Sequence, residues 1–188
     1  MTKKQLNKDV KVVDLGLPSG RLWADRNIGA KSPEDFGLYF SWGNTHGHAL
    51  GTDCSFSSDS YKKTPGAKLT GDIDAEHDAA TVNLGAPWRM PTREDFVELV
   101  KNCTFEFCSL NGYKGMKLTS KINGNSIFFA CSGYGSGAGW LNVGSLGLYW
   151  SASIHSAAGA RYLFFYNGGV YPQDNDDRFG GFAVRPVQ

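Results

Sequence analysis

The side chains best suited to nucleophilic or redox chemistry are few, and their spacing matches no common active site. The four cysteines include no pair spaced as Cys-x-x-Cys, which argues against zinc sites and thioredoxin-like redox motifs. We expect reduced, semi-buried thiols, and a Cys103–Cys108 disulfide stays open as an alternative. The four cysteines are Cys54, Cys103, Cys108 and Cys131.

Two glycine-containing segments could be taken for a metal site or a phosphate loop. His46-Gly47-His48, together with His77, lacks a third ligand at a set spacing, so we expect ordinary loop residues there. The glycine-rich run Ser132–Gly139 lacks the Gly-Lys-Ser/Thr ending that a phosphate-binding loop requires. The sequence therefore predicts no metal site, no nucleotide site and no cofactor.

Three carboxylates lie on one predicted helix and could be taken for an acid/base pair. The helix is expected from Arg93 to about Asn102, with Thr92 as its N-cap. Glu94 and Asp95 fall in its first turn, where negative charge complements the helix dipole, and Glu98 should be solvated. We therefore predict no catalytic residue.

One predicted strand near the C-terminus, Arg161–Tyr166, carries apolar side chains on both faces. Period two places Leu163 and Phe165 on one face, and three aromatic rings on the other. Such a strand is either buried on both sides or uses one face for a partner. Tyrosine suits a binding surface, because it offers large contact area at low entropy cost. The aromatic residues of the candidate patch are Tyr162, Phe164, Tyr166, Tyr171 and Phe179.

An acidic run, Asp174-Asn175-Asp176-Asp177, is predicted to form a turn close to this strand. Clustered oxygen ligands can hold Ca²⁺. The chain lacks the Glu-Pro-Asn and Trp-Asn-Asp signatures of sugar-binding C-type lectins, so a solvated loop is the favoured interpretation. With His155, these residues would form the rim of the aromatic patch.

The elements that must position these side chains are short. Alternating apolar residues on either side of Pro18-Ser19-Gly20 predict a hairpin, and Asn123-Gly124 predicts a second one between Gly115–Ser120 and Ser126–Ala130. Ser32 and Pro33 are typical of a short helix start. A short strand is expected at Tyr39–Trp42 and a helical turn at Asp78–Leu84. Further strands are expected at Leu148–Ser153, Arg161–Tyr166, Gly169–Tyr171 and Phe182–Val187.

Large apolar residues at the inward positions of these elements should form the core. The predicted core consists of Trp23, Trp42, Trp88, Trp150, Phe96, Leu99, Leu163, Phe165, Val170, Phe182 and Val184.

Length and composition predict one soluble globular domain spanning residues 1–188. The chain is 41% hydrophobic and 20% charged, and its 24 glycines are nearly twice ordinary usage, which favours many short strands and ordered loops. A net charge of +1 gives no case for nucleic acid, and no apolar run could span a bilayer. The polar start, Met1–Lys11, predicts no secretory signal, and a cell-surface or phage-particle location stays open.

Four ordered motifs resemble a known family. They are Val13–Ala24 (VDLGLPSGRLWA), Trp88–Thr92 (WRMPT), Tyr149–Ser153 (YWSAS) and Gly181–Val187 (GFAVRPV). Together they resemble the Fibrobacter succinogenes major paralogous domain, common in gut Bacteroidetes and similar to the formylglycine-generating-enzyme branch of the C-type-lectin-like fold. The resemblance runs from about Val13 to Val187. It implies an α+β domain with small twisted antiparallel sheets, one or two helices and long ordered loops.

The ending also resembles the variable proteins of diversity-generating retroelements, in which a C-terminal cassette is rewritten at template adenines. Rewritten Asn codons cannot become Lys, Glu, Gln, Trp or Met, and between Ile154 and Phe182 only Gln173 belongs to that set. The resemblance implies a variable ligand-binding segment at 154–182 and favours the exposed interpretation of the aromatic strand. Its ligand-binding residues would be His155, Gly159, Tyr162, Phe164, Tyr166, Gly169, Tyr171, Asp174, Asn175, Asp176, Asp177, Phe179 and Gly180.

The sequence thus predicts a non-catalytic binding domain for a macromolecular ligand, a protein or a surface glycan. Formylglycine-generating enzymes use a redox-active cysteine pair near the C-terminus, and here no cysteine follows Cys131. Two alternatives stay open. One is a structural or adhesin accessory domain with the same fold and no dedicated site. The other is a degenerate enzyme of that family or a Ca²⁺ lectin.

Overall fold

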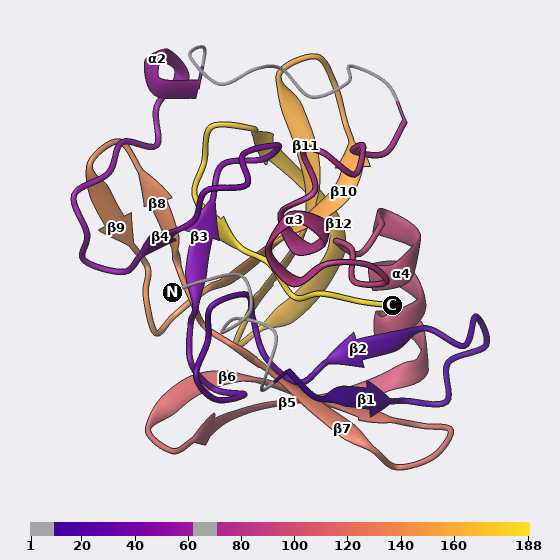
Figure 1. The fold of residues 1–188 in the computed structure, drawn as a ribbon. Helices are drawn as coiled ribbons and strands as arrows, with labels where there is room; N and C mark the ends of the chain where they lie inside the picture. The colour runs from indigo at the N-terminus through magenta and orange to yellow at the C-terminus, as the bar shows by residue number, and fades with distance from the viewer. Residues whose placement is uncertain (1–9, 62–70) are drawn as a thin grey trace.

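The computed structural model describes residues 10–61 and 71–188. The chain has a mixed α+β structure made mostly of small antiparallel sheets, with few helices (Figure 1). This confirms the α+β class expected from the sequence. Within the described ranges, no helix is both long and apolar enough to cross a membrane.

The largest sheet has six strands in the order β12-β11-β10-β13-β3-β4, and only β10 and β13 run parallel. The C-terminal strands expected from the sequence are confirmed, although β13 stops earlier and β12 runs on to Asp177. That extension exists because the acidic residues pair with the first half of β11. The strands are β3 (Leu38–Phe40), β4 (His48–Ala49), β10 (Gly147–Ile154), β11 (Gly159–Tyr166), β12 (Gly169–Asp177) and β13 (Phe182–Ala183).

A three-stranded antiparallel sheet lies below the six-stranded one in Figure 1, in the order β5-β6-β7. Its strands are β5 (Cys103–Leu110), β6 (Tyr113–Ser120) and β7 (Ser126–Ala130). The predicted hairpin around Asn123-Gly124 is confirmed, and Gly124 adopts the positive φ of 77° that such a turn favours. β5, which continues directly from the preceding helix, was not expected from the sequence.

Two small hairpins complete the β structure. The predicted N-terminal hairpin is confirmed as β1 (Val12–Asp14) paired with β2 (Leu22–Ala24). A second one pairs β8 (Tyr134–Ser136) with β9 (Gly139–Leu141) in the glycine-rich run. That run is therefore a strand pair and has no helix after it to bind phosphate.

The described helices are α2 (Ser58–Tyr61), α3 (Ala79–Leu84) and α4 (Arg93–Asn102). The capping box predicted for α4 is present, since the Thr92 side chain accepts from the Asp95 backbone and Asp95 accepts from Thr92. The helix predicted at Ser32 is wrong. The Asp35 carboxylate instead accepts from the Lys31 backbone, and Gly37 at φ 72° turns the chain into β3.

The six-stranded sheet is buried on both faces in its middle. One face packs on Phe96 and Leu99 of α4 and on the three-stranded sheet. The other packs on Trp42, Met90 and α3. All predicted core residues are buried except Val170, which is half-buried at the edge of the first cluster.

The four motifs behind the resemblance meet around the C-terminal segment. Val187 forms bridges to both Trp23 and Arg89, and Ala183 pairs with Tyr149. Arg185 is fully buried among them, donating to Asn27, to the carbonyls of residues 24 and 25, and to that of residue 128. The start, middle and end of the chain are thereby held together.

Candidate functional site

Three aromatic rings form a stacked group at the turn between β11 and β12. The rings of Phe164 and Tyr171, which face each other across the two strands, lie 5.7 Å apart at 22°. Tyr166 completes the group, 5.8 Å from Phe164 at 27° and 6.2 Å from Tyr171 at 5°. Tyr166 is 39% and Tyr171 46% exposed, while Phe164 is half-buried. We call Phe164, Tyr166 and Tyr171 the aromatic platform.

Glycines in the turn let the two tyrosines lie flat on the backbone. A Cβ at Gly168 would lie 2.5 Å from Cε2 of Tyr166, and one at Gly169 would lie 3.0 Å from the Tyr171 hydroxyl. A hydrogen bond with Tyr166 raises the pKa of the Tyr171 phenol. The platform is therefore backed by main chain on one side and open on the other, and Gly169, a predicted site residue, supports it.

Three of the five rings predicted for the patch are not exposed, and Phe164 of the platform is one of them. Tyr162 is only 7% exposed, because it packs 5.0 Å from Phe182 and 6.0 Å from Trp150 on the second face of the sheet. Phe179 is half-buried. The predicted alternation along β11 is correct, but the middle of the strand is covered on both faces. Exposure begins only at the turn, with Tyr166.

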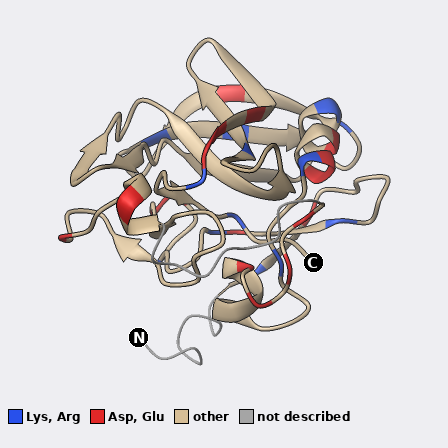
Figure 2. Ribbon diagram, turned by 90° about the horizontal axis from the view of Figure 1, so that it is seen from above, with Lys and Arg blue, Asp and Glu red and all other residues tan. Residues whose placement is uncertain are grey.

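The acidic run was predicted as a turn and is instead the second half of the edge strand β12. Asp174 lies opposite Tyr162, whose hydroxyl is 3.5 Å from its Oδ2. Asn175, Asp176 and Asp177 are exposed. Partial desolvation, and then the neighbouring charges of Asp177 and Asp174, raise the pKa of the Asp176 carboxyl. Elsewhere, basic and acidic residues are interspersed over the ribbon (Figure 2).

The remaining predicted residues lie around the loop between β10 and β11. His155 is exposed, whereas Gly159 and Gly180 are buried and contribute only backbone atoms to this region. The buried Arg178 donates to the Ser156 and Gly159 carbonyls, and its guanidinium lies 4.6 Å from the Trp42 ring centroid. This loop is thus fixed in place at the end of the sheet away from the platform.

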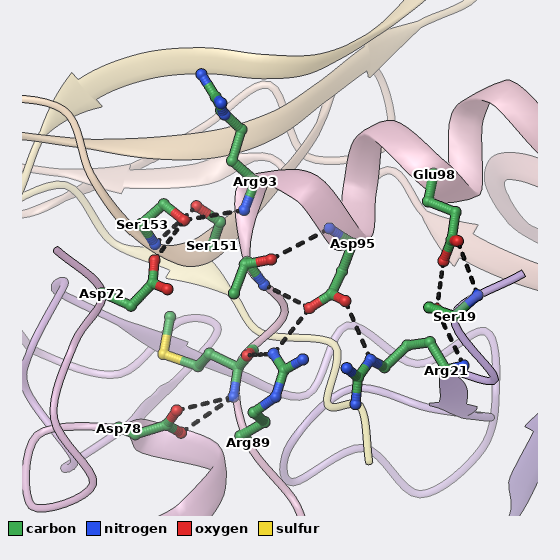
Figure 3. Close-up of polar contacts among 12 residues, drawn as sticks. Ser19, Arg21, Asp72, Asp78, Arg89, Arg93, Asp95, Glu98, Ser151 and Ser153 are labelled. Atoms are coloured by element: carbon green, nitrogen blue, oxygen red, sulfur yellow. Dashed lines mark hydrogen bonds and ion pairs between the residues drawn. The ribbon is translucent and has the colours of Figure 1, made fainter.

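The carboxylates of α4 are structural, as Figure 3 shows. Asp95 Oδ1 accepts from Arg21 Nε at 3.0 Å, and Oδ2 lies 2.8 Å from Arg89 Nη1. Burial alone would raise the pKa of Asp95, but hydrogen bonds and the charges of these arginines hold it below its usual value. Glu98, expected to be solvated, accepts from the Ser19 backbone N–H at 3.0 Å. Both carboxylates tie the helix to the N-terminal hairpin.

The start of α4 is also attached to β10. The Arg93 backbone N–H donates to Ser153 Oγ at 3.0 Å, and that hydroxyl donates to Asp72 at 2.7 Å (Figure 3). Asp78, the N-cap of α3, accepts from the backbone N–H of Met90, which lies just before α4. The segment 72–95 is therefore pinned to the sheet that carries the platform.

The histidines and cysteines do not gather into a reactive centre. His46 and His48 have ring centroids 5.1 Å apart, while His77 pairs with Asp74. Within the described ranges, no group of three or more metal-ligating side chains could hold an ion. The four cysteines are free thiols, and burial raises the pKa of Cys103 and Cys131 to about 11, which disfavours the nucleophilic thiolate.

A pocket of about 610 Å³ beside β3 and β4 was not expected from the sequence. Two of its polar side chains are already engaged in holding loops. Asp35 accepts from the Lys31 backbone, and Asn83 donates to the Thr45 and Ala79 carbonyls. No periodic pattern marks such a pocket, because loops distant in sequence form it.

Comparisons of this chain with protein-family models, with curated proteins and with solved structures found no match.

Proposed function

We propose that this chain is a non-catalytic binding domain that recognises a protein ligand through the aromatic platform and the adjoining acidic half of β12. The observation that carries the proposal is the exposed stack of Tyr166 and Tyr171 on Phe164. Grouped exposed aromatic rings mark interaction sites, and tyrosine is enriched at the energetic centres of protein interfaces. The ligand would lie across the platform, with Asp174 and Asp176 at its rim.

The construction of the site supports recognition more than chemistry. The carboxylates of α4 are engaged with arginines and backbone, and Cys103 and Cys131 are buried thiols with raised pKa values. The platform projects from a sheet fixed on both faces by packed cores. A rigid scaffold that presents a few exposed rings loses little entropy on binding.

We further propose a single C-type-lectin-like domain in which the segment 154–182 is variable. The meeting of Trp23, Arg89 and Val187 supports this, because it closes the start of the chain onto its end. The exposed positions of this segment touch few neighbours, so replacement there should be tolerated. A near-identical template repeat beside a reverse-transcriptase gene would support retroelement rewriting, and flanking DNA without either would contradict it.

A selection experiment tests the binding proposal. A displayed library of random peptides is selected on the folded chain, and the enriched peptides are tested against Tyr166→Ser/Tyr171→Ser. We expect these peptides to lose binding to that variant and to retain it to Ile122→Ser, a more exposed apolar residue in the turn between β6 and β7. Peptides that bind the double variant as well as the unchanged chain would contradict the proposal.

A glycan array probed in parallel distinguishes the other ligand class. Glycans bound by the unchanged chain and lost in the double variant would replace a protein ligand by a sugar. A structural or adhesin accessory domain is favoured if no peptide and no glycan distinguishes the unchanged chain from the double variant.

A further inference from the structure

The free edges of the two larger sheets are protected to very different degrees. An unpaired strand edge offers backbone N–H and C=O groups to any other strand, and proteins block it with charges, proline, bulges or coverage. β12 is blocked in this way by Pro172, by its aspartates and by a register shift. β4, the opposite edge of the same sheet, is only two residues long.

In the three-stranded sheet, β7 is also protected. The carbonyl of Phe128 accepts from the buried Arg185 guanidinium at 2.9 Å. The carbonyl of Ala130 accepts from the buried Tyr149 hydroxyl at 2.7 Å. Two outward carbonyls of β7 therefore already have partners within the chain.

β5 has none of these protections. It is eight residues long, pairs with β6 in continuous register from Cys103 to Leu110, and contains neither proline nor a bulge. Its one charged residue is Glu106, which faces Lys117 across the strands. Phe105 is 43% exposed, and Phe107 is half-buried on the same face.

The hairpin geometry shows which backbone groups of β5 point outward. The two-residue turn of Asn111 and Gly112 has φ values of 48° and 88°, as in a type I′ hairpin, so Leu110 and Tyr113 form a hydrogen-bonded pair. Alternation then directs the N–H and C=O groups of Phe105, Phe107 and Ser109 away from β6. Among the hydrogen bonds of residues 10–61 and 71–188, none uses these outward groups.

We infer that β5 is a self-association edge, at which a second copy of this chain adds its own β5 in antiparallel orientation about a two-fold axis. Pairing centred on Phe107 would extend each three-stranded sheet into a continuous sheet of six. It would place Phe107 against its symmetry mate and Phe105 opposite Ser109, covering the exposed apolar rings.

Charge and symmetry favour a second copy as the occupant. In this register Glu106 lies opposite Cys108 and not opposite another glutamate, and its own Lys117 stays beside it. A net charge of +1 opposes association only weakly. The same pairing at β12 would place aspartates against aspartates, so of these two edges β5 is the one suited to joining identical chains. This inference does not depend on the proposed ligand surface.

Two variants and a matched control test the inference by molar mass measured over a wide range of protein concentration. Ser109→Pro removes an outward N–H while leaving the β6 ladder intact, and Phe105→Lys places a charge at the edge. We expect the unchanged chain to reach the dimer mass at high concentration, and both variants to remain monomeric with unchanged circular dichroism. Ile122→Lys, on the turn between β6 and β7 and 53% exposed, should dimerise as the unchanged chain does.

Hydrogen exchange of the unchanged chain gives a second readout that does not require a variant to fold. The amides of Phe105, Phe107 and Ser109 should gain protection as concentration rises, whereas those of β12 should not. A monomer at every concentration, a dimer that survives both variants, or protection that does not depend on concentration would each overturn the inference.

Discussion

The rings of Tyr166 and Tyr171 lie parallel, at 5° and with centroids 6.2 Å apart, on the glycine turn that joins β11 to β12. Four residues earlier on β11, Tyr162 points to the same face of the sheet and is buried against Phe182. β11 is therefore buried or half-buried along its length and exposed only at its last residue, Tyr166.

Replacing the buried tyrosine and replacing the exposed tyrosines should affect stability to different degrees. Tyr162→Ser should lower the free energy of unfolding by about 3 kcal/mol, because it leaves a cavity between packed rings. Tyr166→Ser/Tyr171→Ser should change it by less than about 1 kcal/mol, as is usual for exposed side chains. Urea denaturation measures both, and equal losses in the two variants would mean that the platform belongs to the core.

Asp95→Asn should destabilise the chain by about 2 kcal/mol, because the buried carboxylate accepts from two arginines and caps α4. The pKa of Asp95 is lowered in the folded chain, so its contribution is present above the ordinary value of 3.8 and is lost as pH falls through the lower folded value. The difference from the unchanged chain should therefore shrink in strong acid. A difference that stays constant down to low pH would contradict this ionic role.

Asp176→Asn should raise the melting temperature at neutral pH. Partial desolvation, together with the charges of Asp177 and Asp174, raises the pKa of Asp176 in the folded chain, so its ionised form opposes folding once pH exceeds the raised value. The gain should vanish below pH 3.8, where the carboxyl is protonated in both states. Glu106→Gln on β5 is the control and should bring no such gain. An unchanged or lower melting temperature for Asp176→Asn at neutral pH would refute the expectation.

Arg185→Lys should cost about 3 kcal/mol or more. The Arg185 guanidinium is fully buried, donates to four acceptors and lies 4.6 Å from the Phe129 ring centroid, and an ammonium cannot reproduce that planar arrangement. Arg161→Lys, at a half-buried position on β11, is the control and should stay within about 0.5 kcal/mol. Similar unfolding free energies for the two variants would show that the C-terminal segment does not depend on Arg185.

The parts of the fold that follow local rules were predictable from sequence. The capping box of Thr92 and Asp95 and the Asn123-Gly124 turn each depend on residues close together in the chain, and both are confirmed. The burial of Tyr162 was not predictable, because Trp150 and Phe182 cover it from other strands. Periodicity assigns a side chain to a face, but only tertiary packing decides whether that face is covered.

The acidic run shows the same limit. Asp, Asn and Gly are turn formers, so the sequence favoured a turn at 174–177, whereas pairing with β11 draws these residues into β12. Pairing partners distant in sequence also made β5 hard to predict. The exposure of Tyr166 and Tyr171 agrees with the prediction, because both lie next to a short hairpin turn, whereas Phe164 is half-buried.

Chemical labelling of tyrosine tests the binding surface most directly. The chain is labelled alone and with a saturating peptide selected as described above, and each modified tyrosine is quantified by mass spectrometry. We expect the labelling of Tyr166 and Tyr171 to fall sharply in the complex, while Tyr113, 37% exposed on the three-stranded sheet, is labelled as before. Unchanged labelling of Tyr166 and Tyr171 in the saturated complex would contradict a ligand-binding role for the platform.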